Sequence, residues 1–237
     1  MNLIDELLRY WIAAPWPIAF TIAFASNTTA YLISAYIIER ASHLLIDRKM
    51  AAWIDDRAPR ANQRRIEIYY GIIACGIFAA LSLLTRLVYS TVWPENLIEL
   101  LLQVVVFIIF YETYSYFVHR LLHTKWLIKI HAVHHRSTRT TPWSAYSVHP
   151  IEAAFIGISA PIFMLFVPMS IGVAFVLHFS GMLFTIFIHS NTSLLHVNPA
   201  TNLTNNLANQ HVTHHRVGNR NFGFVNSIWD YLCKTKG

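Results

Sequence analysis

Five long apolar segments dominate the chain and restrict it to folds that a lipid bilayer can accommodate. They run over residues 17–38, 67–90, 97–118, 151–167 and 171–189. A helix needs about 20 apolar residues to span a bilayer, and the first three segments are long enough. Only 13% of the 237 residues are charged, against about 25% in soluble domains. The sequence therefore predicts an all-α integral membrane helical bundle, with residues 1–237 forming a single domain.

The last two apolar segments are shorter and leave part of the topology open. The sequence "FVPMSIG" joins them, and Pro168 and Gly172 indicate a tight turn between the two. We expect a hairpin over residues 151–189 that either crosses the bilayer as two spans or enters it only partly.

Basic residues are distributed very unevenly between the apolar segments. Sixteen of the 18 Lys and Arg lie in residues 39–66, 119–150 and 190–237. If all five segments cross the bilayer, these three regions lie on the same side. The positive-inside rule then predicts that this side is cytoplasmic and that the N-terminus lies on the opposite side. Because topology accounts for the charge, the net charge of +6 does not call for a nucleic-acid partner.

Histidines form three clusters, and all of them fall in the predicted cytoplasmic regions. On a helix, positions i, i+3 and i+4 share one face, so the imidazoles of each cluster point the same way. Neutral imidazole binds iron, zinc, copper and nickel. Eight such ligands exceed the need of one ion and suffice for two. The eight predicted ligands are His119, His123, His131, His134, His135, His211, His214 and His215.

Three further histidines have weaker signals. His189 ends the fifth apolar segment at the level of His119, so it is a candidate ninth ligand. Its alternative role is that of an interfacial residue bonded to lipid headgroups or to Asn191. His149 lies at the same level, but Pro150 follows it and favours a role at a helix start. His178 lies in the middle of an apolar segment and is expected to be a hydrogen-bonded core residue.

The motifs HxxxH at 119–123, HxxHH at 131–135 and HxxHH at 211–215, set among apolar segments, resemble the fatty acid hydroxylase/sterol desaturase superfamily. The resemblance covers residues 112–230 and includes "YSYFVHRLLH", "SVHPIE", "HSN", "NFG" and "WD". It implies a catalytic region with two iron ions that activates O2. The implied reaction is hydroxylation or desaturation of an unactivated C–H bond in a sterol, fatty acyl or sphingolipid type of lipid.

The same resemblance suggests roles for two carboxylates and for outside partners. Glu112 stands where family members often have Asp, and Asp230 follows Trp229 near the end of the family's pattern. The resemblance implies that both orient ligand histidines, although Glu112 could equally bond a neighbouring helix and Asp230 could equally be a charge on a helix surface. Because the chain has no GxGxxG motif and no cysteine set for an iron–sulfur cluster, electrons are expected from a separate reductase, ferredoxin or b-type cytochrome. Zinc is expected to replace iron in overexpressed protein.

Two other functions fit a histidine-rich membrane protein. A zinc-dependent membrane hydrolase usually carries HExxH, which is missing here. A metal-binding or metal-transport protein places ligands near the middle of the bilayer, whereas these clusters lie at one edge. Beyond the last span, we expect residues 198–210 to form a loop or short turns, because they are rich in Asn and have no apolar face. Residues 211–232 regain apolar side chains and could form an amphipathic helix that packs on the membrane surface or on the bundle.

Overall fold

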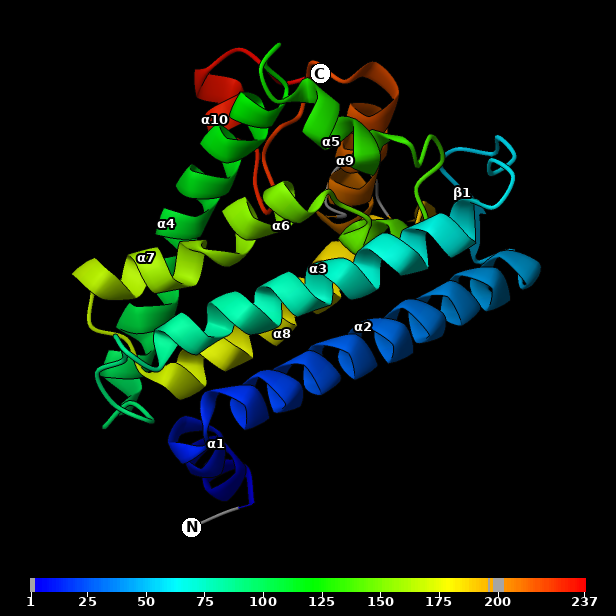
Figure 1. Ribbon diagram of the computed structural model, residues 1–237. Coiled ribbons are helices and arrows are strands. Elements are labelled where there is room, and N and C mark those ends of the chain that lie inside the picture. Colours follow the sequence, from blue (N-terminus) through cyan, green and yellow to red (C-terminus); the bar gives the residue numbers. More distant parts are fainter. Residues whose placement is uncertain (1–2, 196, 198–202) are drawn as a thin grey trace.

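The computed structural model describes residues 3–195, 197 and 203–237, and it is mostly helical (Figure 1). Two short strands and one 3-10 helix accompany the α-helices. The elements in chain order are α1 (Leu3–Ala13), α2 (Trp16–Asp47), β1 (Ala51–Trp53), α3 (Gln63–Thr85), α4 (Leu97–Leu122), α5 (Ile128–His135), η1 (Pro142–Tyr146), α6 (Pro150–Gly157), α7 (Ser159–Phe166), α8 (Ile171–Ile188), β2 (Thr192–Leu194), α9 (Leu203–Val217) and α10 (Ile228–Leu232).

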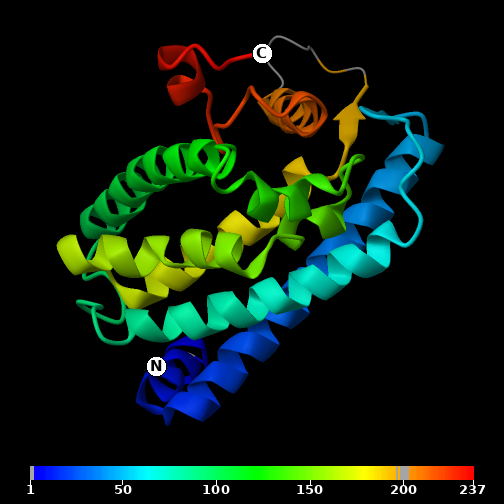
Figure 2. The ribbon, with the colours of Figure 1, turned by 45° about the horizontal axis from the view of Figure 1, so that its top comes forward.

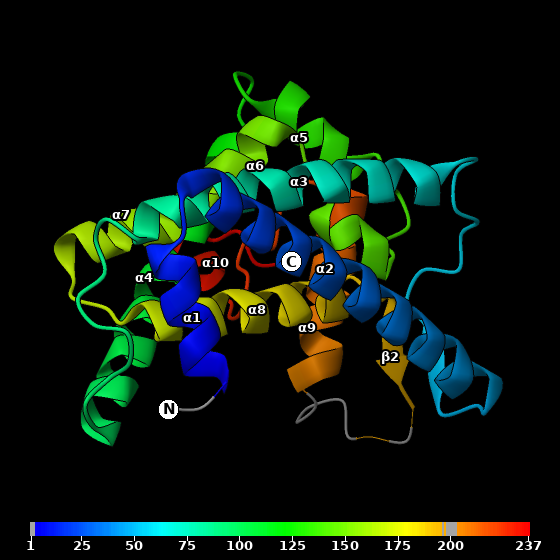
Figure 3. The ribbon, with the colours of Figure 1, turned by 60° about the horizontal axis from the view of Figure 1, so that its bottom comes forward.

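Four described helices are long and apolar enough to cross a membrane: α2, α3, α4 and α8. They form the bundle, and Figure 3 shows α2 lying across α3 and α8. Small residues bring the long helices together. A Cβ at Gly71 of α3 would lie 2.5 Å from the hydroxyl of the buried Tyr31 in α2, so only glycine fits there. The predicted all-α membrane bundle is confirmed.

The apolar segment 151–167 differs from a single spanning helix. It forms α6 and α7, which are eight residues each and meet at Ile158. Pro161 explains the break, because proline has no backbone N–H to donate to the carbonyl of Gly157. Even taken together, residues 150–166 are shorter than each of the described helices that are long enough to span a membrane. The segment nevertheless connects the two ends of the bundle.

Hydrogen bonds identify which segments share each end of the bundle. At the first end, Arg86 donates to the carbonyls of Ile12 and Ala14, and the N–H of Ile171 donates to Thr91. This end therefore holds α1, the loop after α3 and the start of α8. The opposite end holds α5, α9, α10 and the β1–β2 pair (Figures 1 and 2). The three basic regions lie toward this second end, and its cytoplasmic location remains a prediction.

The tail differs from the predicted loop. Residues 198–202 lie outside the described residues, but α9 begins at Leu203 and includes most of the remaining Asn-rich stretch. Three buried residues, Asn205, Ala208 and Val212, follow helical spacing along α9. The amide of Asn205 bonds both the N–H and the carbonyl of Leu194. The prediction of a loop from 203 onward was wrong because this buried face includes a polar residue whose partner is distant in sequence.

Candidate metal centre

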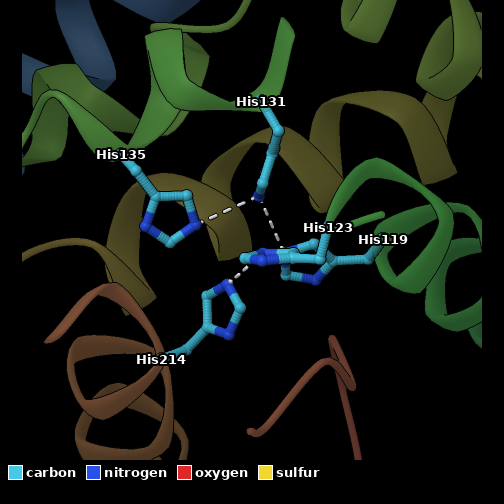
Figure 4. A group of neighbouring side chains, drawn as sticks. All are labelled: His119, His123, His131, His135 and His214. Atoms are coloured by element: carbon cyan, nitrogen blue, oxygen red, sulfur yellow. Dashed lines mark hydrogen bonds between the residues drawn. The ribbon is translucent and has the colours of Figure 1, made fainter. Parts of the chain in front are cut away.

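Among the residues that the structure describes, nine histidines converge at the second end of the bundle in two groups. Within each group, one ring nitrogen from every histidine lies within 4.8 Å of the others. The first group comes from α4, α5 and α9, and Figure 4 shows its rings directed toward one another. The second group comes from α5, α8 and α9. The first group comprises His119, His123, His131, His135 and His214, and the second comprises His134, His189, His211 and His215.

The first group is closely spaced through its Nε2 atoms. The Nε2 of His131 lies 3.2 Å from that of His119 and 3.1 Å from that of His135. The Nε2 atoms of His123 and His214 are 3.1 Å apart. Metal–nitrogen bonds of about 2.0–2.1 Å at right angles would separate neighbouring ligands by about 3 Å. The observed spacing is thus the spacing of imidazoles around one ion.

The second group has similar spacing around His189, the residue that directly follows α8. Its Nε2 lies 2.8 Å from that of His211 and 3.5 Å from that of His134. His211 and His215 are 3.1 Å apart through the same atoms. The spacing of each group fits a single ion, so the nine histidines provide two separate candidate sites.

Backbone carbonyls fix the ring orientation of four histidines. The Nδ1 of His119 donates to the carbonyl of Phe222 at 3.0 Å, and that of His214 donates to Arg220 at 2.6 Å. His134 and His189 bond in the same way to the carbonyls of Ser147 at 3.3 Å and Thr185 at 2.7 Å. A carbonyl can only accept, so these rings carry their proton on Nδ1 when neutral.

The orientation of these rings shows whether the residues present can hold metal ions. With Nδ1 protonated, the Nε2 atoms of His134 and His189 both present bare lone pairs to each other. Lone pairs facing across a buried site repel unless a cation lies between them. Ligand histidines in metalloproteins are oriented by similar bonds from the other ring nitrogen. The donor set therefore fits metal ions.

The protonation state of the rings agrees with this use. Burial lowers the pKa of His134, His211 and His215 well below the usual value of 6.5. Burial also lowers the pKa of His123 and of His189 to about 4. Near neutral pH these imidazoles are uncharged, which is the form that binds metals.

The structure brings together all eight histidines predicted from the three motifs, and His189 joins them. Asn191 does not bond His189 but pairs with the backbone of Asp55 through two hydrogen bonds of 2.8 and 2.7 Å. His149 lies outside both groups. It precedes α6, and its Nδ1 accepts the N–H of Ile151 at 3.2 Å, as the following proline suggested.

The two carboxylates suggested by the resemblance bond the tail instead of the histidines. Glu112 accepts the N–H groups of Val225 and Asn226 at 2.8 and 3.1 Å. Asp230 accepts those of Phe222 and Gly223 at 2.9 and 2.8 Å. Asp230 thus holds the residue whose carbonyl orients His119. Neither carboxylate directly contacts an imidazole of the two groups, and both instead hold the backbone of the tail.

A third carboxylate, Glu152 of α6, was missed by the sequence analysis. Its Oε1 lies 2.8 Å from the Nδ1 of His131, and both side chains are buried. Its Oε2 is buried and has no hydrogen-bond partner among the described residues. The available signal was a carboxylate at the start of an apolar segment, within "SVHPIE". An ionisable residue in such a position is by default a candidate for function.

Two adjoining cavities lie between the histidines and the interior of the bundle. The first has a volume of about 100 Å3 and is lined by His119, His131, His134, His189 and Glu152, among others. The second has a volume of about 300 Å3 and is mostly apolar. Five residues line both, namely Tyr111, Ala145, Ile156, Thr185 and Phe224. The candidate metal sites therefore face an apolar space inside the membrane bundle.

Comparison with known proteins identifies relatives of this chain. It is 32% identical over 136 residues to the Delta(7)-sterol 5(6)-desaturase of Saccharomyces cerevisiae, covering 56% of this chain and 36% of that protein. It is 25% identical over 257 residues to the lathosterol oxidase of Homo sapiens, covering 98% of this chain and 84% of that protein. A Candida glabrata Delta(7)-sterol 5(6)-desaturase is 28% identical, with 62% of this chain and 40% of that protein covered.

The chain thus spans well under half the length of the two yeast relatives. No solved structure matches it significantly. The profile of the fatty acid hydroxylase family matches residues 104–235, which include all nine clustered histidines and Glu152. On this match, together with the three histidine motifs, the chain belongs to the fatty acid hydroxylase family.

Proposed function

We propose that this protein is a membrane-bound di-iron oxidoreductase that uses O2 to hydroxylate or desaturate an unactivated C–H bond in a lipid. One observation carries the proposal: histidines of both buried, neutral groups line a small cavity that adjoins a larger apolar cavity within the membrane bundle. The relatives support a lipid substrate, since their names describe a sterol desaturase and a lathosterol oxidase. Iron supplies the oxidising power that amino-acid side chains lack.

The residues would divide the work of holding the two ions. The five-histidine group would hold one ion, and the four-histidine group the other. Carbonyls of Thr185, Ser147, Arg220 and Phe222 keep four of the rings aligned. Burial of both groups excludes bulk water, which protects an oxidising centre from side reactions. The apolar cavity would hold the lipid with one carbon next to the histidines.

A separate protein would supply the electrons. The basic regions lie toward the histidine end of the bundle, which suits an acidic reductase, ferredoxin or b-type cytochrome. Zinc would bind the same imidazoles without supporting oxidation, because it has no redox chemistry.

Metal analysis combined with O2 consumption tests the proposal. Protein expressed in iron-replete medium should contain two iron ions per chain and consume O2 only with a lipid and an electron donor present. One iron ion per chain in fully active protein contradicts the di-iron assignment. Activity with zinc and without O2 would instead indicate a hydrolase, and metal release across vesicles without lipid oxidation would indicate a transporter.

A further inference from the structure

A polar pair lies in the apolar interior of the bundle, far from the candidate metal sites. The Nε2 of His178 in α8 is 2.7 Å from the Oδ1 of Asn27 in α2. His178 was expected to be a hydrogen-bonded core residue, and this bond agrees with that expectation. The side chain has a second property, however, because it also lines the 300 Å3 cavity that adjoins the histidine-lined one.

The cavity continues past this polar pair. A further space of about 60 Å3 is lined by His178, Asn27, Ser82 and Thr85 together with apolar residues. Five residues line both spaces: Phe78, Gly157, Ala160, Ala174 and His178. The three cavities thus form a series from the metal sites to a small polar space at the far end, which we call the polar niche.

The distance between the polar niche and the histidines can be derived from the rise along α8. His178 precedes His189 by 11 residues on one helix, so the two lie about 16 Å apart along its axis. A ligand that reaches both must therefore be elongated.

Hydrogen bonding in the polar niche leaves unused positions for a small polar group. Since the Nε2–H of His178 donates to Asn27, its Nδ1 is a free acceptor among the described residues. Ser82 and Thr85 donate their hydroxyl protons to carbonyls of their own helix, at Ala79 and Ser82, and keep acceptor capacity. The Nδ2 of Asn27 remains a donor. A hydroxyl group both donates and accepts, so it matches this set.

Charge restricts the ligand further. Among the described residues, neither the 300 Å3 cavity nor the polar niche is lined by Lys or Arg. Glu112 is the carboxylate of the larger cavity, and both its oxygens already bond backbone N–H groups. Burial of an unpaired carboxylate or phosphate is costly. A fatty acid anion or a phospholipid headgroup is therefore disfavoured in this position.

We propose that His178 and Asn27 bind the hydroxyl group of an uncharged, elongated lipid whose oxidised carbon lies about 16 Å away at the histidines. This assignment rests on the proposed function, since it takes the histidine end as the place of oxidation. It makes the polar niche the determinant of which carbon is presented, because the hydroxyl fixes how far the chain can advance.

A binding assay with paired probes tests the assignment without measuring turnover. Tritiated 1-hexadecanol and hexadecane are compared by scintillation proximity on the detergent-solubilised holoprotein. The quantity measured is the ratio of the two affinities, determined in the same detergent for each variant. His178→Phe keeps a ring beside Phe78 but removes the acceptor nitrogen. His43→Phe is the matched control, because His43 lies in α2 against Trp53 and outside the cavities.

We expect the alcohol-to-alkane affinity ratio to fall about fivefold in His178→Phe, from the typical contribution of one hydrogen bond. The control should keep the wild-type ratio. An unchanged ratio in His178→Phe overturns the assignment, as does tighter wild-type binding of hexadecanoate than of the alcohol. If His178→Phe does not fold, the double variant Asn27→Leu/His178→Leu removes both partners and gives the same comparison. Wild-type protein without bound metal would overturn the proposed function instead.

Discussion

Replacing Glu152 with Ala should weaken one metal site and leave the other intact. With its Nε2 on a metal ion, the ring of His131 carries its proton on Nδ1 and donates it to Glu152 at 2.8 Å, and that ring belongs to the five-histidine group alone. Loss of the acceptor leaves a buried N–H unpaired, which costs about 1–3 kcal/mol. Removal of such a carboxylate partner typically lowers metal affinity about 10–100-fold. The two estimates agree, since 1.4 kcal/mol corresponds to a factor of about ten.

The conservative change Glu152→Gln separates charge from geometry. Its amide oxygen can still accept from His131, but the bond is no longer charge-assisted and is about half as strong. The new amide group also takes the position of an oxygen that has no hydrogen-bond partner among the described residues. We therefore expect an affinity between those of wild type and Glu152→Ala.

Iron content after dialysis against graded concentrations of a chelator measures both variants. Glu152→Ala should lose one ion at about 10–100-fold lower chelator concentration than wild type, while the second ion is released as in wild type. The matched control is Glu95→Ala, which removes an exposed carboxylate at the opposite end of the bundle. Release of both ions from Glu152→Ala at wild-type concentrations would refute the reasoning, because Glu152 would then be irrelevant to ligand orientation.

Three further predictions concern the same end of the molecule. His189→Ala should lose the ion of the four-histidine group and all activity, as measured by iron content and O2 consumption. His43→Ala should keep both. Wild-type iron content in His189→Ala would show that His189 is not a ligand. Gly223→Ala should lower the melting temperature and the iron content, because its Cβ would clash with the carbonyl oxygen of Asn226; a wild-type melting curve would show that the tail is free to move. The metal-free protein should lose stability as the pH falls from about 6.5 to about 4. Across that window, histidines bind protons in the unfolded chain but not in the folded one, where the pKa of His123 and of His135 is about 4. Each such histidine therefore lowers the free energy of unfolding by about 1.4 kcal/mol per pH unit. Melting temperatures of metal-free protein that do not change between pH 7 and pH 5 would contradict this.

The histidine groups were predictable because their signal is local. Helical spacing places His119 with His123 on one face, and apolar segment lengths place the three motifs at one level of the membrane. The division of the motifs into two groups depends on contacts between segments that are distant in sequence. His131, His134 and His135 lie within five residues, yet His134 belongs to a different group from the other two. That division depends on where α8 and α9 approach α5.

The supporting partners could not be predicted in the same way. Phe222, Ser147 and Arg220 act through backbone carbonyls, which every residue has, so the side-chain sequence carries no trace of them. Glu152 has a recognisable side chain, but its partner His131 lies 21 residues away on another helix. The extent of α9 was missed for a related reason. The side-chain amide of Asn205 bonds the backbone of Leu194, which lies 11 residues earlier and outside the helix, so helical periodicity gives no sign of the contact.

The tail links the metal sites to the fold through a series of direct contacts. Arg220 and Phe222 orient His214 and His119, which both belong to the five-histidine group. Glu112 and Asp230 in turn bind the backbone of residues 222–226. An ion bound by these rings therefore favours the docked tail, and the docked tail favours the ligand tautomer of the rings. Because a site assembled from distant segments does not exist in the unfolded chain, the free energy of metal binding contributes to folding. We therefore expect Glu112 and Asp230 to affect the candidate metal site through this coupling, even though neither directly contacts one of its imidazoles.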